Sequence, residues 1–228
     1  MQIIIFLVVA IFLIPEPAFS GSIKGLTIFS GKAQQLKTHK TGSYKKACGS
    51  DIINESILID NKGVMNSVIS LRGEKLKKKS GEYKLDQKKC KYEPHVVTMP
   101  VDSELIIHTS DPINHNIHTY SFENDPINLM FLPGQDAYSQ EMEEAEIIKV
   151  ECDLHNWMRA WIVVTPNGYS TVSKRDGSFE IHDVPPGKYE LNAWHETLGS
   201  LTKSIIVGND KLNINFDFSE VIQEEARR

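Results

Sequence analysis

The 228-residue chain has little cysteine and lacks the motifs of several large enzyme classes. Its three cysteines include no closely spaced pair, which argues against a structural zinc site. No Gly-x-Ser-x-Gly, His-Glu-x-x-His or Walker sequence occurs, so we expect neither a serine hydrolase, a zincin protease nor a P-loop nucleotidase. A net charge of −5 argues against nucleic acid as a partner.

The mature part of the chain also lacks helical patterning. No stretch shows an apolar stripe with a 3.6-residue period, and past residue 22 no run is apolar enough to span a membrane. Short segments rich in β-branched residues, such as ELIIHT and AWIVVT, recur between turn residues. With 40% hydrophobic and 24% charged residues, a packed core is expected. We therefore predict an all-β protein.

The longest apolar run lies at the N-terminus. It has twelve residues, from Ile3 to Ile14, and the small residues Ala18 and Ser20 follow it. A membrane-spanning helix needs about 20 apolar residues, whereas a signal peptide needs fewer and ends at small residues. No Lys or Arg precedes the run, and a retained anchor is the alternative. We expect residues 1–20 to be a signal peptide and the mature protein to be periplasmic or secreted by a bacterium.

Export changes how the three cysteines are interpreted, because an oxidising compartment favours pairing two of them. Cys152 has a histidine and a methionine at ligand spacing, whereas Cys48 and Cys90 have no such neighbours. We therefore expect a Cys48–Cys90 disulfide and a lone Cys152. A free, buried thiol at any of the three positions is the alternative.

The segment VECDLHNWMRAW places Cys152, His155 and Met158 three residues apart. Thiolate, imidazole and thioether together form a soft donor set, and soft sulfur ligands select copper. An electron-transfer site of the blue-copper kind has one Cys and two His in a plane, with a long axial Met. The loop supplies only one His, so the second must come from elsewhere in the chain.

Two histidines are candidates for the second ligand. His115 follows an extended segment and an Asp-Pro turn, and it can face inward. His95 is the alternative, because Pro94 holds the preceding residue extended and the segment lies close to Cys90 in sequence. We rank His115 first because Asn116 follows it.

The two separated motifs resemble those of the cupredoxins. The motif at 115–118 is His-Asn-Ile-His, and the later Cys-x2-His-x2-Met has the short spacing of amicyanin. The resemblance covers roughly residues 90 to 165. It implies a Greek-key β-sandwich that holds one type 1 copper. The implied ligands are His115, Cys152, His155 and, on the axis, Met158.

Residues beside the ligands complete this interpretation. In the family, the Asn after the first His helps to tie the two ligand segments together, and Asn116 fits that role. Asp153 stands where the amicyanin pattern has Thr, and Asn156 stands where it has Pro. Both positions influence hydrogen bonding around the thiolate, so they are expected to affect the redox potential.

A second resemblance covers the C-terminal part of the chain. The motifs Asp-Gly-x-Phe at 176–179 and Val-Pro-Pro-Gly-x-Tyr-x-Leu at 184–191 are similar to the carboxypeptidase regulatory-like β-sandwich. The whole arrangement is similar to secreted bacterial proteins, some labelled methylamine-utilisation proteins. The predicted plan is a copper domain with an N-terminal β extension at 21–165, a smaller β-sandwich at 166–219 and a polar tail at 220–228.

The expected function is electron transfer without catalysis, with a redox protein such as a cytochrome or an oxidoreductase as partner. Multicopper oxidases need additional His-x-His pairs, and this chain has none. A copper chaperone or storage protein and a metal-free structural β-sandwich are the alternatives. In the electron carrier, the His155 imidazole would be the exit, surrounded by apolar surface formed by residues such as Met130, Phe131 and Pro133.

Overall fold

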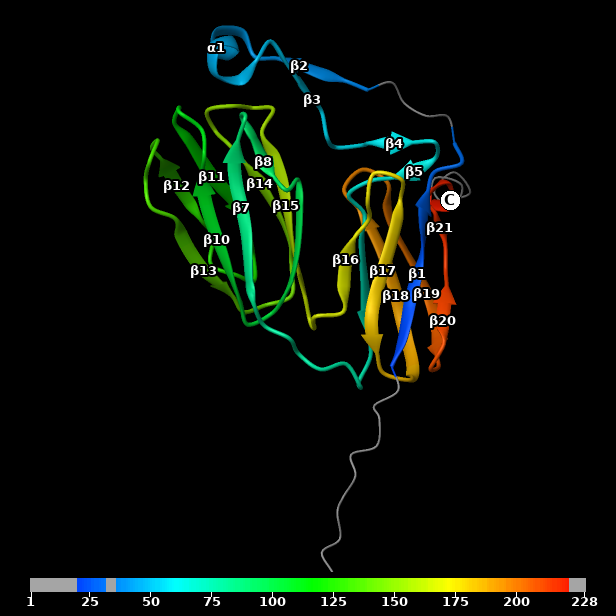
Figure 1. Cartoon of the computed structure of the whole chain (residues 1–228). Helices are drawn as coiled ribbons and strands as arrows, with labels where there is room; N and C mark the ends of the chain where they lie inside the picture. The colour runs from blue at the N-terminus through cyan, green and yellow to red at the C-terminus, as the bar shows by residue number, and fades with distance from the viewer. Residues whose placement is uncertain (1–19, 32–35, 222–228) are drawn as a thin grey trace, which may run out of the picture.

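The computed structural model describes residues 20–31 and 36–221, and most of its regular structure is strand (Figure 1). Residues 1–19 of the predicted signal peptide and residues 222–228 of the predicted polar tail lie outside the described part. Within the described residues, no helix is long and apolar enough to cross a membrane. The prediction of an all-β protein is confirmed.

The first sandwich consists of a four-stranded and a five-stranded sheet (Figure 1). The four-stranded sheet has the order β13-β10-β7-β8, and β10 runs parallel to β7. The five-stranded sheet has the order β12-β11-β14-β15-β9, and β15 runs parallel to β9. The strands are β7 (Glu82–Lys88), β8 (Lys91–Glu93), β9 (Val96–Pro100), β10 (Ser103–Thr109), β11 (His115–Tyr120), β12 (Asn128–Phe131), β13 (Tyr138–Met142), β14 (Ile147–Glu151) and β15 (Arg159–Thr165).

Alternation of side chains explains how these strands build a core. In β10, Leu105 and Ile107 are buried while Glu104 and His108 are exposed, as expected for a strand with one face on the core. In β15 almost every residue is buried, because its second face packs against the other sandwich. The core of the first sandwich is therefore continuous from β10 to the strands that flank the Cys-His-Met loop.

The second sandwich also consists of two sheets. One has the order β17-β1-β5-β4, with β20 and β21 paired to β1, and the other has the order β16-β6-β18-β19. Its strands are β1 (Gly21–Ile28), β4 (Ile59–Asp60), β5 (Gly63–Val64), β6 (Val68–Arg72), β16 (Ser170–Val172), β17 (Ser178–Val184), β18 (Gly187–His195), β19 (Gly199–Val207), β20 (Lys211–Asn213) and β21 (Phe216–Asp217).

The N-terminal strands belong to this second sandwich, which differs from the predicted grouping of residues 21–165. β1 pairs with β17, with Ile23 opposite Ile181, and β6 pairs with β18, with Leu71 opposite Leu191. All four side chains lie in the second core. The local pattern of a strand indicates which face is apolar, but the partner strand comes from far away in the sequence. The N-terminal strands are thus no extension of the first sandwich.

The two sandwiches are packed against each other through β15. Val163 meets Val68 of the second sandwich in a small separate core, and the Trp161 and Trp194 rings meet edge to face with centroids 5.2 Å apart. Beside them, the ring of His95 bonds to the carboxylate of Glu196. A buried polar pair and two indoles therefore join the sandwiches.

His195 lies next to this junction, and its burial predicts a pH dependence of stability. Burial lowers the pKa of His195 from 6.5 to about 4, because the Glu196 carboxylate raises it less than burial and the nearby His95 lower it. Below pH 6.5 the unfolded chain therefore binds a proton that the folded chain refuses. We expect the free energy of unfolding to fall by up to about 3 kcal/mol between pH 6.5 and 4.

The variant His195→Asn tests this prediction by urea denaturation at pH 7, 6, 5 and 4. The His195 Nδ1 accepts the backbone N–H groups of Thr197 and Leu198, and an Asn side-chain oxygen offers an acceptor in a similar place. The loss of stability over this pH range should be smaller in the variant than in the parent. Equal losses in both proteins would contradict the assignment.

A segment outside both sandwiches lies over one end of the first (Figure 1). This covering segment, residues 38–53, consists of strand β2 (Thr38–Lys40), a 3-10 turn η1 (Gly42–Tyr44), the helical turn α1 (Lys45–Cys48) and strand β3 (Asp51–Ile53). β2 and β3 pair with each other, and the predicted disulfide is present between Cys48 and Cys90. The disulfide fixes the covering segment to the turn between β7 and β8.

Candidate metal centre

The Cys-His-Met loop is a tight connection between the paired strands β14 and β15. Its backbone closes on itself, since Cys152 N–H donates to the Met158 carbonyl (3.3 Å) and Met158 N–H donates to the His155 carbonyl (2.8 Å). His155 N–H in turn donates to the Cys152 carbonyl (3.3 Å). All three side chains are buried. The loop thus holds its thiol, imidazole and thioether inside the end of the first sandwich.

His115 enters the same place from the start of β11. Its imidazole is fully buried, and its Nδ1 lies 3.0 Å from Nδ1 of His155. Cys152 Sγ lies 3.6 Å from His155 Nδ1. One donor atom from each of the three residues lies within 4.8 Å of the others. Strand β11 and the β14–β15 loop are far apart in the sequence, and the fold brings a thiol and two imidazoles from them together.

Cys152 is electrostatically prepared to act as a thiolate. Burial raises its pKa, but hydrogen bonds from His115, His155 and the backbone N–H groups of Asn116 and Leu154 lower it more, from 9.0 to about 6. A pKa near 6 leaves the group mostly ionised at neutral pH. Metal ligation requires the thiolate form.

The orientation of His115 is set by Asp111. The Asp111 carboxylate accepts the Nε2 proton of His115 (2.9 Å) and also the backbone N–H groups of Lys89 (2.6 Å) and Cys90 (2.7 Å). Burial opposes ionisation of Asp111, but the hydrogen bonds from His115 and these backbone groups lower its pKa overall. With Nε2 of His115 held by Asp111, the other ring nitrogen, Nδ1, faces His155 and the Cys152 thiol. Sequence reasoning missed this role, although a carboxylate four residues before His115 is a visible signal.

Replacing Asp111 by asparagine should weaken metal binding. The change removes the charge that favours the Nε2-protonated imidazole while it preserves the size of the side chain. Loss of such a partner behind a ligating histidine typically costs 10–100-fold in affinity, and we expect a decrease of that order. Competition with a chelator of known copper affinity measures the change. The variant Asp86→Asn, at an exposed His108 pair outside the site, is the control and should keep the parent affinity.

Asn116 links strand β11 to the Cys-His-Met loop. Its side-chain oxygen accepts the backbone N–H of Asp153 (2.6 Å), and its amide donates to the Asp153 carboxylate (2.8 Å). The same carboxylate faces the ring of His118 at 3.2 Å. β11 and the loop are thereby held in register one residue beyond His115 and Cys152, the place where the sequence predicted such a tie.

Two further candidates have different positions. Met158 lies buried in the same core as Cys152, and its role as the axial ligand stays a prediction. His95 lies outside the group of three donors, because its ring is engaged by Glu196 at the junction of the sandwiches. Of the two histidines weighed from the sequence, the structure places His115 with Cys152 and His155.

The donor set fits a copper ion. Its members are one thiolate and two imidazole nitrogens, the ligand types that soft and borderline transition metals prefer, and copper above others when a thioether lies near. The side chains that hydrogen-bond to these donors within the described part of the chain are each other and Asp111, and the backbone N–H groups of Asn116 and Leu154 also bond to Cys152. A metal would therefore find lone pairs that converge on one place.

The expectation that the His155 imidazole reaches the surface is wrong. The residue is only 1% exposed, and its Nε2 is buried without a hydrogen-bond partner. Phe131, which was expected at the same apolar surface, is fully buried, whereas Met130 is exposed. The covering segment causes this burial, because the ring of Tyr44 lies edge-on to His155 with centroids 4.4 Å apart. Tyr44 lies far from His155 in the sequence, so no residue pattern near the loop indicates that His155 is covered.

No family model and no curated protein matches the chain. Among solved structures it is similar to a copper-containing nitrite reductase from Thermus scotoductus SA-01, at 15% identity over 36% of this chain and 22% of that chain, with TM-score 0.34. It is also similar to the oxidised state of an amicyanin mutant, at 26% identity over 37% of this chain and 83% of that chain, with TM-score 0.34. It is also similar to a purple cupredoxin from Nitrosopumilus maritimus, at 25% identity over 32% of this chain and 81% of that chain, with TM-score 0.29. TM-scores this low assign the chain to no family, so a metal centre is inferred from the residues of the site itself.

Proposed function

We propose that the chain is an exported, mononuclear type 1 copper protein that accepts and passes on single electrons. The observation that supports this best is that Cys152, His115 and His155 each place a donor atom within 4.8 Å of the other two, inside the core. Copper held by such donors alternates between Cu(I) and Cu(II), which is the chemistry that the ion supplies when bound.

In this proposal the protein residues hold the ligands still. Asp111 keeps the proton of His115 on Nε2, and Asn116 fixes the spacing between β11 and the ligand loop. The surrounding apolar core excludes water from the donors. Met158 would be the axial ligand from the same loop. A rigid, dry donor set limits reorganisation when an electron arrives or leaves, and it suits a carrier.

The buried state of the donors argues against the alternatives. A copper chaperone passes its ion to an acceptor by ligand exchange, and this needs a ligand that an acceptor can reach, whereas His155 is covered by Tyr44. A metal-free structural protein would bury a thiolate and two imidazoles without the ion that satisfies their lone pairs, and burying such groups is costly. Electron transfer therefore fits the geometry better.

The setting of the protein is part of the proposal. We place it in the bacterial periplasm or outside the cell after removal of residues 1–20, with a redox protein as partner. The proposal assigns no catalytic residue. The second sandwich, whose motifs resemble the carboxypeptidase regulatory-like domain, would serve in packing and attachment.

Spectra and metal analysis of the purified mature protein test the proposal. After loading with Cu(II), we expect about one copper per chain, an intense thiolate-to-copper absorption in the visible and an EPR spectrum with narrow copper hyperfine splitting. Reversible reduction should remove the colour. Absence of bound copper, or copper without the thiolate absorption, would show that the proposal is wrong.

A further inference from the structure

Tyr44 packs against the buried imidazole of His155 and is itself exposed to solvent. Its ring lies edge-on to the His155 imidazole, with centroids 4.4 Å apart, and 6.0 Å from Trp157. Tyr44 is 40% exposed, whereas His155 is 1% exposed. A molecule that approaches this end of the first sandwich would therefore touch Tyr44 before it could reach the imidazole.

The covering segment is held firmly against the site. The Cys48–Cys90 disulfide joins it to the turn whose backbone N–H groups bond to Asp111. The Trp157 indole of the ligand loop donates to the Cys90 carbonyl at 3.1 Å. The disulfide, Asp111 and the ligand loop thus form one connected unit, and Tyr44 keeps a fixed place over His155.

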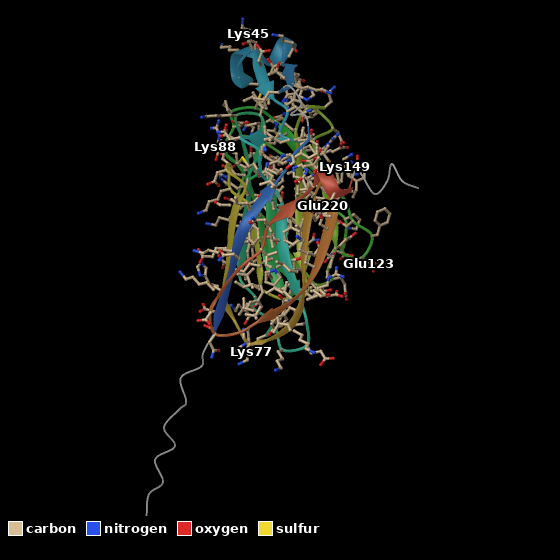
Figure 2. The ribbon with its side chains drawn as sticks, turned by 90° about the vertical axis from the view of Figure 1, so that its right-hand side faces the viewer. Lys45, Lys77, Lys88, Glu123, Lys149 and Glu220 are labelled. Carbon is tan, nitrogen blue, oxygen red and sulfur yellow. A yellow bond between two sulfur atoms is a disulfide. The ribbon has the colours of Figure 1, made fainter. Side chains whose placement is uncertain are left out.

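The surface around Tyr44 is positively charged although the chain is acidic overall. Lys45, Lys46 and Lys89 are exposed, and within the described part of the chain none of them has an ion-pair partner. Lys45 lies at the extreme end of the molecule in Figure 2. The three unpaired ammonium groups therefore create a local positive field on a chain with net charge −5.

The same surface is hollowed beside the tyrosine. Tyr44 and Lys46 line an open hollow of about 360 Å³ together with Ala47, Pro112 and Ile113. Pro112 and Ile113 belong to the turn between Asp111 and His115, so the hollow borders the segment that carries His115. It combines an aromatic and aliphatic lining with a charged edge, as protein interfaces combine an apolar centre with a polar rim.

We infer that Tyr44, its hollow and the lysines around it form the docking surface for an acidic redox protein, and that electrons enter and leave the site through Tyr44. The inference rests on the proposed electron-transfer function. The positive edge would steer a partner that carries carboxylates around its own redox centre. In each encounter one electron passes between the site and the partner, one being oxidised and the other reduced, with no bond made or broken.

Charge reversal near Tyr44 tests the inference kinetically. The variant Lys45→Glu/Lys46→Glu is compared with Lys75→Glu/Lys77→Glu, which changes the net charge equally on a loop at the opposite end of the molecule, where Figure 2 shows Lys77. Stopped-flow absorption follows oxidation of the reduced, copper-loaded proteins at low ionic strength. The oxidants are anionic hexacyanoferrate(III) and cationic tris(1,10-phenanthroline)cobalt(III).

The two variants should behave differently. We expect the second-order rate constant with hexacyanoferrate(III) to fall about 10-fold in Lys45→Glu/Lys46→Glu and the rate constant with the cobalt complex to rise. In Lys75→Glu/Lys77→Glu both should change by less than about 2-fold, since Lys77 lies at the opposite end of the molecule from Lys45 (Figure 2). Equal effects of the two variants, or no effect of either, would overturn the inference.

A second measurement needs no copper and so separates this inference from the proposed function. Redox-inert, paramagnetic hexacyanochromate(III) is added to the metal-free protein, and NMR line broadening locates where the anion binds. Broadening centred on residues 43–47 and on Ile113 is expected. Broadening centred on the loop at 73–81 would overturn the docking surface, whereas failure to bind copper would overturn only the electron-transfer function.

Discussion

Replacing Cys152 by serine is expected to abolish the thiolate-to-copper absorption completely and to lower copper affinity by more than about 100-fold. Loss of a residue that merely supports a ligand typically costs 10–100-fold, so loss of the sulfur ligand itself should cost more. Serine is close to cysteine in size, but its hydroxyl stays protonated at neutral pH and is a poor ligand for copper. Visible spectroscopy and titration of copper against a competing chelator measure both effects.

The matched control for this prediction is His95→Gln. His95 is a buried imidazole at the junction of the sandwiches, outside the group of three donors. The His95→Gln variant should keep the thiolate-to-copper absorption band, whereas His115→Gln should lose this band. Near-ultraviolet circular dichroism of the metal-free variants reports whether each is folded. An unchanged band in a folded Cys152→Ser protein would exclude Cys152 as a ligand, and loss of the band in folded His95→Gln would restore His95 as a candidate.

The closeness of His115, Cys152 and His155 was predictable because these residues lie in short motifs with fixed spacing. Cys152, His155 and Met158 share one loop, and the length of a β-hairpin connection limits where their side chains can go. His115 was harder to assign, since His95 also follows an extended segment. Only the pairing of β11 with β14 decides between them, because that pairing brings the start of β11 to the end of the sandwich where the loop lies.

Features that depend on distant chain segments were not predictable to the same extent. Cys48 and Cys90 could be paired by elimination, but nothing in the sequence shows that this disulfide brings Tyr44 onto His155. The helical turn α1 (Lys45–Cys48) follows Tyr44 directly, and the effect of the disulfide on Tyr44 appears only when the fold is complete. The expected exposure of His155 failed for this reason.

The pairing of the sandwiches shows the same limit on a larger scale. β1 and β6 have ordinary strand patterns, and these agree equally well with either sandwich. Their membership in the second core follows from registers such as Ile23 opposite Ile181, which join residues far apart in the chain. The boundary near residue 166 was visible from its turn residues, whereas the return of the N-terminal strands was not.

Removing the disulfide with the variant Cys48→Ala/Cys90→Ala should both destabilise the protein and uncover the site. The two cysteines are 42 residues apart in sequence, and closing a loop of that length in the unfolded chain corresponds to about 4 kcal/mol in the free energy of unfolding. Without the covalent link, the covering segment keeps the packing of Ile52 and Ala47 against the first core and the Tyr44 contacts. Urea denaturation measures the loss of stability.

Uncovering is measured separately in the metal-free protein with diethyl pyrocarbonate, which acylates accessible imidazoles, followed by mass spectrometry. His155 should become reactive in Cys48→Ala/Cys90→Ala and stay protected in the parent. His182 is exposed and serves as the internal reference, and fully buried His115 should stay protected in both proteins while they remain folded. Reaction at His115 and His155 together would report global unfolding instead. Protection of His155 in the folded variant would mean that packing of Tyr44, Ile52 and Ala47, without the disulfide, holds the covering segment over the candidate metal centre.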